Sequence, residues 1–264
     1  MATYLDRIVA AHREAAAADT RPLSGLVAEA EAMAPARGFA DARRNASAAE
    51  GELAVIAEVK RRSPSKGDLN RGLDPASTAR AYATGGAACL SVLTDVEFFG
   101  GSPADLQAAR AAVEVPVLRK DFTVAPADVC DARLMGADCV LLIAAALDDS
   151  ELSDLHALAG QVGIEALVEV HDESELERAL DAGAGLVGVN QRDLVTFEVD
   201  HDRAVRVAKA MPASVTRVAE SGVGGAGDAR ALAAAGFDAV LVGESVVTAA
   251  DPASAVRALR GPHR

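Results

Sequence analysis

Charged side chains close several short apolar runs of this 264-residue sequence. Glu58 and Lys60 stand two residues apart at the end of one run, so in an extended strand both face the same side. Lys120, Glu169 and Glu220 close three further runs. Charges at such positions are costly to bury unless they are paired. Lysine–carboxylate sets of this kind are typical of general acid–base catalysis, because an ammonium donates protons and a carboxylate of near-neutral pKa exchanges them.

The runs that carry these charges alternate with amphipathic segments, which indicates repeated strand–helix units. Eight apolar runs are expected to be strands: Leu53–Val59, Ala87–Leu93, Val115–Leu118, Ala137–Ile143, Ile164–Val170, Leu186–Val189, Val215–Ala219 and Ala239–Val242. The segments between them often open with Pro and close with Gly, as helices do. Near-continuous apolar strands are typical of parallel sheets, and eight βα units close a (β/α)8 TIM barrel. A doubly wound sheet would need distinct edge strands, which the runs do not show.

Residues 1–50 precede the first run and predict a helical extension. Helices are expected over Tyr4–Ala18 and Leu23–Ala34, and Pro35–Gly51 is expected to be a loop with a short helical stretch. Each helix is too short to bury a core alone. We therefore expect one domain overall, with the extension attached to a barrel over residues 51–264.

Two glycine-rich segments have the composition of a phosphate site. Ser221–Gly225 would follow the seventh strand, and Gly243–Ser245 would follow the eighth and lead into a short helical stretch. TIM barrels often bind phosphate in these two loops, where backbone N–H groups approach the anion. Gly222–Gly227 also fits the dinucleotide pattern GxGxxG, but that fingerprint belongs to the first unit of an open sheet. A phosphate site is the better interpretation.

The composition excludes several classes of partner. The net charge is −13 and the sequence pI is near 4.8, whereas nucleic acids and anionic membranes attract clustered positive charge. No apolar run approaches the roughly 18 residues of a membrane span, and the N-terminus lacks a secretory pattern. The three cysteines form no CxxC pair, which argues against disulfides and zinc. We expect a cytoplasmic protein without a metal ion.

Seven ordered motifs resemble the indole-3-glycerol-phosphate synthase family. They are Glu58–Gly67, Leu90–Asp95, Phe98–Ser102, Val117–Phe122, Leu167–His171, Gly188–Leu194 and Ala219–Val223. The resemblance extends from about residue 4 to about residue 260, and most motifs lie at expected strand ends. Gln191 and Arg62 depart from the family, which often has Asn and a small residue there. The length leaves no room for a fused isomerase domain, so the chain resembles the monofunctional form.

The resemblance implies conversion of 1-(2-carboxyphenylamino)-1-deoxyribulose 5-phosphate to indole-3-glycerol phosphate by ring closure, decarboxylation and dehydration. It implies that Lys120 is the general acid of ring closure and Glu169 the acid/base of dehydration. Further implied roles concern binding and support: Lys60 for the substrate carboxylate, Glu58 for holding Lys60, Glu220 for supporting the lysines, and Asn190 and Ser221 for substrate hydroxyls or the carbonyl.

The resemblance also implies a phosphate end and an aromatic end of the site. Phosphate would lie on N–H groups near Gly222 and Gly243, beside Ser63, Arg192, Glu244 and Ser245, and Pro64, Phe99 and Phe122 would wall the anthranilate ring. No cofactor is expected, because the aromaticity lost at ring closure already primes the carboxylate to leave. The expected partner is this small anionic phosphate, and the expected state is a monomer.

The same residues leave two alternative functions open. Lys60 or Lys120 could instead form a Schiff base, as in an aldolase, or the chain could be a non-catalytic phosphate-binding barrel.

One histidine is a candidate for the site. His171 would lie on the same strand face as Glu169 and could reach the site. The other histidines are expected to be solvated: His12, His156, His201 and His263.

Overall fold

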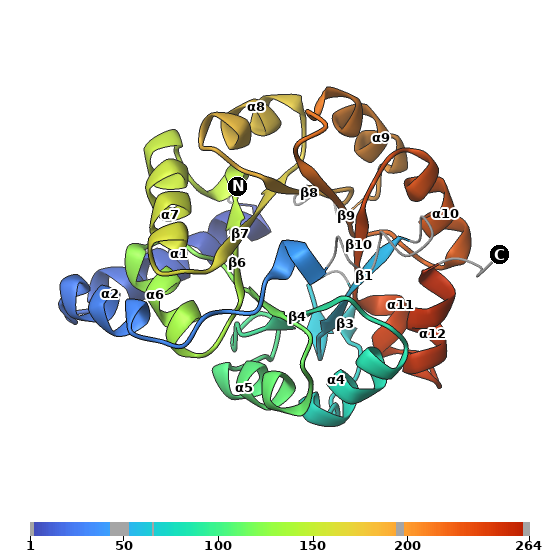
Figure 1. The fold of residues 1–264 in the computed structure, drawn as a ribbon, viewed down its shortest axis with the longest axis horizontal. Helices are drawn as coiled ribbons and strands as arrows, with labels where there is room; N and C mark the ends of the chain where they lie inside the picture. The colour runs from blue at the N-terminus through green and yellow to red at the C-terminus, as the bar shows by residue number, and fades with distance from the viewer. Residues whose placement is uncertain (1–2, 43–52, 65, 194–197, 261–264) are drawn as a thin grey trace.

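Eight parallel strands form a closed barrel in the computed structural model, which describes residues 3–42, 53–64, 66–193 and 198–260. The order around the barrel is β1–β10–β9–β8–β7–β6–β5–β4 (Figure 1). The strands are β1 Ala54–Val59, β4 Cys89–Leu93, β5 Val117–Lys120, β6 Cys139–Ile143, β7 Glu165–Val170, β8 Leu186–Asn190, β9 Thr216–Glu220 and β10 Ala239–Val242. The predicted (β/α)8 barrel is confirmed, and each predicted run contains most or all of one strand except Val115–Leu118, which contains only the first half of β5.

Helices surround the strands on the outside of the barrel (Figure 1). They are α4 Pro75–Thr84, α5 Pro103–Ala112, α6 Pro126–Leu134, α7 Asp149–Gln161, α8 Glu173–Asp181, α9 His201–Ala210, α10 Ala226–Ala234, α11 Glu244–Val247 and α12 Pro252–Leu259, with a 3-10 turn at Ala144–Ala146. Asp74, Ser102 and Asp251 each cap the first turn of a helix that begins with Pro, as the sequence predicts. No helix among the described residues is long and apolar enough to span a membrane.

The N-terminal segment packs as two helices, α1 Tyr4–Ala18 and α2 Leu23–Glu31. The first matches the prediction, whereas the second ends three residues before Ala34 because Pro35 disfavours a helical conformation in the preceding residue. Residues 39–42 are helical, within the expected loop, and residues 43–51 of that expectation lie outside the described residues. A small hairpin of β2 Arg62–Ser63 and β3 Gly67–Asp68 was not expected.

The pleat of each strand decides which side chains reach the inside of the barrel. Side chains alternate between the two faces, so residues two apart point the same way. On β1, Ala54 and Ile56 belong to a cluster of buried apolar side chains inside the barrel, here called the inner cluster. Glu58 continues the same face at the strand's carboxyl end. On β9, Val218 lies in the inner cluster and Glu220 follows on the same face. The inner face is thus apolar until the strand ends, where it becomes charged.

Candidate active site

A pocket of about 500 Å³ opens at the carboxyl ends of the strands. Every residue to which the sequence analysis gave a catalytic or binding role lines it: Glu58, Lys60, Ser63, Pro64, Phe99, Lys120, Phe122, Glu169, Asn190, Arg192, Glu220, Ser221, Gly222, Gly243, Glu244 and Ser245. The structure therefore brings the whole nominated set to one cavity, as expected for the catalytic face of this fold.

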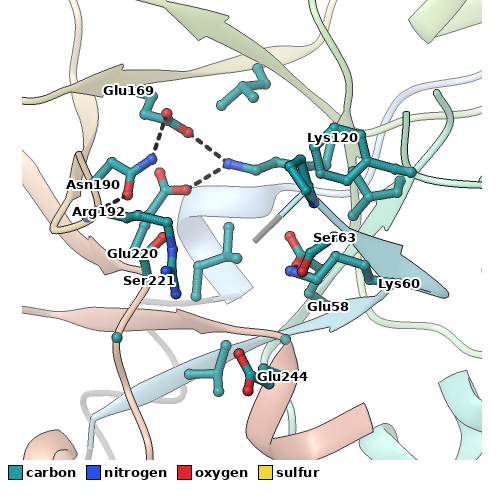
Figure 2. A pocket seen from close by; sticks show the side chains of 18 of the residues that line it. Glu58, Lys60, Ser63, Lys120, Glu169, Asn190, Arg192, Glu220, Ser221 and Glu244 are labelled. Carbon is teal, nitrogen blue, oxygen red and sulfur yellow. Dashed lines mark hydrogen bonds and ion pairs between the residues drawn. The ribbon is translucent and has the colours of Figure 1, made fainter. Parts of the chain in front are cut away.

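The ammonium of Lys120 lies between two buried carboxylates (Figure 2). Its Nζ donates to Glu169 Oε2 at 2.7 Å and to Glu220 Oε2 at 2.7 Å. Asn190 Nδ2 donates to the other oxygen of Glu169 at 2.9 Å. These four side chains come from β5, β7, β8 and β9, so closure of the barrel is what assembles them.

A glycine on β8 makes room for this cluster. A Cβ at Gly188 would lie 2.0 Å from Glu220 Oε1, a distance that no side chain could occupy without displacing the carboxylate. Glu220 Oε1 is buried and has no hydrogen-bond partner among the described residues. One oxygen of Glu220 thus faces a space without a donor, whereas both oxygens of Glu169 accept hydrogen bonds.

The two carboxylates differ in pKa because their surroundings differ. Burial raises the pKa of Glu220, and the negative charge of Glu169 adds to this effect, so that the pKa reaches about 7 despite the attraction of Lys120. Burial also opposes ionisation of Glu169, but Lys120, His171 and the hydrogen bond from Asn190 outweigh it and lower its pKa to about 2. Near neutral pH the site therefore combines an ionised carboxylate, an ammonium and a carboxyl group that titrates.

Replacement of Glu220 by Gln should change how stability depends on pH. Folding raises the pKa of Glu220 from 4.5 to about 7, so between these values the folded state holds a proton that the unfolded state has lost. The unfolding free energy of the parent should therefore fall by roughly 3 kcal/mol as pH rises through this window, and the Gln variant should lack that fall. Urea unfolding at pH 5 and pH 8 measures the difference. Parallel losses in both proteins would contradict the assigned titration.

A second ion pair lies on β1. Lys60 Nζ contacts Glu58 Oε1, and both side chains are largely buried. Ser91 Oγ on the neighbouring β4 donates to Glu58 Oε2 at 3.5 Å. A Cβ at Gly243 would lie 2.4 Å from Glu58 Oε1 and 2.9 Å from Lys60 Nζ. The loop after β10 therefore approaches this pair closely, and a side chain at position 243 would have to displace Glu58 or Lys60.

The expected phosphate loops line the pocket, and the first of them contains two residues with positive φ. Ser221 has φ of 64°, the left-handed region that few residues other than glycine occupy, and Gly222 follows with φ of 70°. Such strain in a non-glycine residue is frequent at functional sites. Ser245 Oγ donates to the carbonyl of Val223 at 3.0 Å and joins the two loops. The backbone N–H of Arg192 donates to Asn190 Oδ1 at 3.0 Å, which places this loop beside the cluster.

The opposite side of the pocket is aromatic and apolar. The rings of Phe99 and Phe122 lie 6.2 Å apart with an interplanar angle of 37°. The sequence analysis missed the contribution of α1, whose Tyr4, Leu5 and Ile8 also line the pocket. Positions 5 and 8 lie on one helix face, a spacing that was visible in the sequence without showing what that face would cover.

The expectation of solvated histidines is wrong for His12. Its side chain on α1 is 20 % exposed and hydrogen-bonds Asp95 at 3.1 Å, because α1 lies against the loops after β4 and β5. His201 is exposed, as expected, and its Nδ1 lies 3.2 Å from Gln191 Oε1. His156 is half-buried on α7, and His263 lies outside the described residues. His171 does not line the pocket, and its Nε2 lies 3.8 Å from Glu169 Oε1.

The three cysteines are free and buried, as expected for inert thiols. Burial raises the pKa of Cys139 and of Cys130, which keeps both as neutral thiols at physiological pH. None of the three cysteines lines the pocket. Thiol chemistry therefore has no place in this site.

A parallel (β/α)8 barrel with lysine–carboxylate pairs and glycine loops at its strand ends defines a barrel enzyme with acid–base chemistry for an anionic substrate. The family model for indole-3-glycerol phosphate synthase matches residues 5–259, nearly the whole described chain. The chain belongs to the indole-3-glycerol phosphate synthase family. This confirms the family inferred from the motifs and the function predicted with it, that of a lyase in tryptophan biosynthesis.

Curated relatives agree along the full length. The chain is 48 % identical to an indole-3-glycerol phosphate synthase of Aromatoleum aromaticum over 99 % of this chain and 100 % of that protein. It is 52 % identical to one of Mycolicibacterium vanbaalenii over 97 % of this chain and 93 % of that protein. A thiamine phosphate pyrophosphorylase from Pyrococcus furiosus has a similar fold, with a TM-score of 0.61 at 17 % identity over 79 % of this chain and 94 % of that chain. The last similarity concerns the fold alone.

Proposed function

We propose that this pocket converts 1-(2-carboxyphenylamino)-1-deoxyribulose 5-phosphate to indole-3-glycerol phosphate as a carboxy-lyase that needs no cofactor. The observation that carries the proposal is the Lys120 ammonium held between Glu169 and Glu220. This cluster holds a proton donor and two proton acceptors in one hydrogen-bonded group. The reaction needs both, because it adds a proton in one step and removes a proton in another. With the substrate as a carboxylate, each turnover takes up one proton and releases carbon dioxide and water.

Ring closure requires protonation of the ribulose carbonyl. The aryl carbon that bears the carboxylate attacks that carbonyl carbon, and the carbonyl oxygen accepts a proton from Lys120 Nζ as it becomes a hydroxyl. Burial alone would lower the pKa of Lys120, but the charges of Glu169, Glu220 and Glu58 outweigh it and raise the pKa well above its usual value. Lys120 therefore enters the step charged, and Glu169 and Glu220 can accept its hydrogen bonds as the proton moves.

Decarboxylation follows from the electronic state of the closed ring. Attack at the carboxylate-bearing carbon interrupts the aromatic sextet, and loss of carbon dioxide returns its electron pair to the ring. Lys60 is positioned to bind the carboxylate before it leaves, and Glu58 holds Lys60 in place. The carboxylate needs no electron sink beyond the substrate itself.

Dehydration completes the indole. The new hydroxyl leaves as water as it accepts a proton, and the carbon next to the ring nitrogen loses one. We assign both transfers to Glu169, which is ionised and hydrogen-bonded to Asn190: it takes the proton from that carbon, passes it to the departing hydroxyl and ends the step ionised again. Asn190 and Ser221 would hold the substrate hydroxyls, and Glu220 would support Lys120 through the cycle.

The remaining pocket residues divide into an anionic end and an aromatic end. The phosphate would lie on the loop amides near Gly222 and Gly243, beside Ser63, Arg192, Glu244 and Ser245. Pro64, Phe99 and Phe122 would wall the anthranilate ring. Lys60, Lys120 and Arg192 would attract this anion into a protein of net charge −13, because local charge rather than net charge governs the field in a pocket.

The architecture supports further proposals about the whole molecule. Residues 1–50 would act as an extension of the barrel rather than as a domain, since α1 lines the pocket of the 51–264 unit. One chain supplies both ends of the pocket, which suits a monomer. Three buried free thiols suit the reducing cytoplasm.

A Schiff-base mechanism is disfavoured by the surroundings of both lysines. A lysine nucleophile must be neutral, and enzymes achieve this by desolvation or a neighbouring cation. Lys120 instead contacts two carboxylates, and Lys60 contacts one. The carboxylates raise the pKa of Lys120 well above its usual value and keep this amine protonated, which suits proton donation.

Replacement of Arg192 by Ala should weaken binding rather than chemistry. We expect KM to rise about tenfold or more and kcat to change little, since one charge-assisted hydrogen bond to a phosphate contributes roughly 1.5–3 kcal/mol. Inorganic phosphate should compete with substrate, and its inhibition constant should rise by the same factor. The matched control is Arg230→Ala on the exposed side of α10. A fall in kcat with unchanged KM would contradict the phosphate assignment.

The reaction itself is tested with purified protein treated with a chelator and freed of cofactors. Indole fluorescence and released carbon dioxide are measured together, and the absence of Trp keeps the protein background low. Equal yields of indole product and carbon dioxide are expected. A requirement for an added metal or cofactor, or a borohydride-trapped adduct on either lysine, would contradict the proposed chemistry.

A further inference from the structure

A histidine of the N-terminal helix joins the two loops that carry the aromatic wall. His12 Nε2 lies 3.1 Å from Asp95 Oδ2 and 3.7 Å from Asp121 Oδ1. His12 belongs to α1, Asp95 follows β4 and Asp121 follows β5. We call these three residues the His12 clasp. None of them was expected to contribute to the site, and Asp121 alone lines the pocket.

Both carboxylates of the His12 clasp also hold the backbone of an aromatic residue. Asp95 Oδ1 accepts the backbone N–H of Phe98 at 2.6 Å and that of Phe99 at 2.9 Å. Asp121 Oδ1 accepts the backbone N–H of Phe122 at 2.9 Å. The imidazole itself packs on the ring of Phe122, with 5.5 Å between ring centroids. The position of the imidazole is thus coupled to both rings of the wall.

The charges around His12 favour its protonated form. Burial opposes protonation, but the hydrogen bond to Asp95 and the negative charges of Asp121 and Asp128 outweigh it, so the pKa of His12 is raised above its ordinary value. Arg119 Nη2 donates to Asp121 Oδ2 at 3.0 Å and offsets part of the charge of Asp121. Asp128 on α6 is a further acid whose negative charge acts on the imidazole.

The same atoms are spaced so that a divalent cation would also fit, because the ligand atoms of the His12 clasp lie within 4.8 Å of one another. Asp121, however, already accepts hydrogen bonds from Thr94 and Arg119. Asp95 accepts the two backbone amides and faces His12. The donors present therefore satisfy both carboxylates without an ion.

We propose that His12 is a positioning residue for the aromatic part of the substrate: as an imidazolium it bridges Asp95 and Asp121 and fixes the spacing of the Phe99 and Phe122 rings. The proposal rests on the proposed function, since it requires the anthranilate ring to lie at this wall. The contact with Asp95 is a hydrogen bond that a neutral imidazole can keep through its Nε2–H, whereas the contact with Asp121 at 3.7 Å depends on the positive charge of the ring. Loss of the proton therefore removes the attraction between His12 and Asp121, loosens the link between the two loops and lowers affinity for the ring, while the phosphate end is unaffected.

The test compares the parent with His12→Gln, because Gln keeps a donor for Asp95 but never carries charge. Substrate KM, kcat and the inhibition constant of inorganic phosphate are measured from pH 6 to pH 9. At pH 6 the variant's KM should exceed the parent's by about three- to tenfold, the range expected for the net contribution of one ordinary polar contact. Since the imidazolium is lost as pH rises through its raised pKa, the ratio should approach one by pH 9. The control is His156→Gln on α7, which should match the parent.

Three results would overturn the proposal. A KM ratio that does not change with pH would show that charge on His12 is irrelevant. An equal rise in the phosphate inhibition constant would show a general structural effect. A rise in the parent's KM after chelation, reversed by a divalent cation, would make the cluster a metal site.

The role of His12 can be tested even if the proposed reaction is not observed. If neither protein turns over substrate, the dissociation constant of the carbonyl-reduced substrate replaces KM, measured by anthranilate fluorescence in this Trp-free chain. The same dependence of the variant-to-parent ratio on pH is required. The melting temperature of both proteins verifies that each is folded before binding is compared.

Discussion

Replacement of Lys120 by Ala should lower kcat by roughly 10²–10⁴, the range typical of a general acid. The reason is its position: its ammonium donates to Glu169 and Glu220, and no other lysine among the described residues lines this part of the pocket beside both carboxylates. KM should change much less, because Lys120 is assigned to the carbonyl oxygen in the transition state rather than to the phosphate. Steady-state kinetics with indole fluorescence measures both parameters.

Loss of Lys120 also leaves two buried carboxylates without their shared cation, so stability must be measured alongside activity. Lys120→Met keeps much of the apolar stem and should show the same loss of kcat. Lys209→Met, on the exposed side of α9, is the matched control. The assignment is wrong if kcat falls less than about tenfold in a variant that is folded and binds substrate.

Replacement of Glu169 by Gln should also lower kcat by roughly 10²–10⁴. The amide keeps the size of the side chain and accepts a hydrogen bond from Asn190 or Lys120, but it cannot take up or return a proton. In the parent, Lys120 and Asn190 keep Glu169 ionised in a buried site. KM should remain within a few-fold of the parent, because the substitution removes no positive charge.

The control for this variant is Glu173→Gln, an exposed residue in the first turn of α8. It alters the formal charge equally and lies outside the pocket. Equal losses in the two variants would indicate a general charge effect. Full activity of Glu169→Gln would remove Glu169 from the mechanism and favour Glu220, the other carboxylate on Lys120.

Much of this site could be predicted because strand geometry is visible in the sequence. The two-residue spacing of Glu58 and Lys60 predicted a shared face, and both side chains line one pocket. The order of apolar runs predicted the barrel. Eight similar strands show no distinct edge strand, and a closed barrel pairs the backbone hydrogen-bonding groups of every strand on both sides. The motifs then indicated which strand-end residues belong together, because each motif ends at the same edge of the barrel.

Other features depend on tertiary contacts that no local pattern contains. His12 looks like any polar residue on a helix until α1 is placed against the loops after β4 and β5. The different pKa values of Glu169 and Glu220 arise from burial and from the charges and hydrogen bonds of Lys120, His171 and Asn190, which a one-dimensional pattern cannot weigh. The β2–β3 hairpin has two residues per strand, too few to give a periodic signal.

The central claim is that Lys120 acts before carbon dioxide leaves and Glu169 acts after it. A single-turnover experiment, quenched over time, measures released carbon dioxide and indole product separately for the parent, Lys120→Met and Glu169→Gln. Glu169→Gln should release close to one equivalent of carbon dioxide per site while indole lags far behind, and Lys120→Met should release neither. If carbon dioxide and indole appear together in Glu169→Gln, whether slowly or quickly, this division of roles is contradicted.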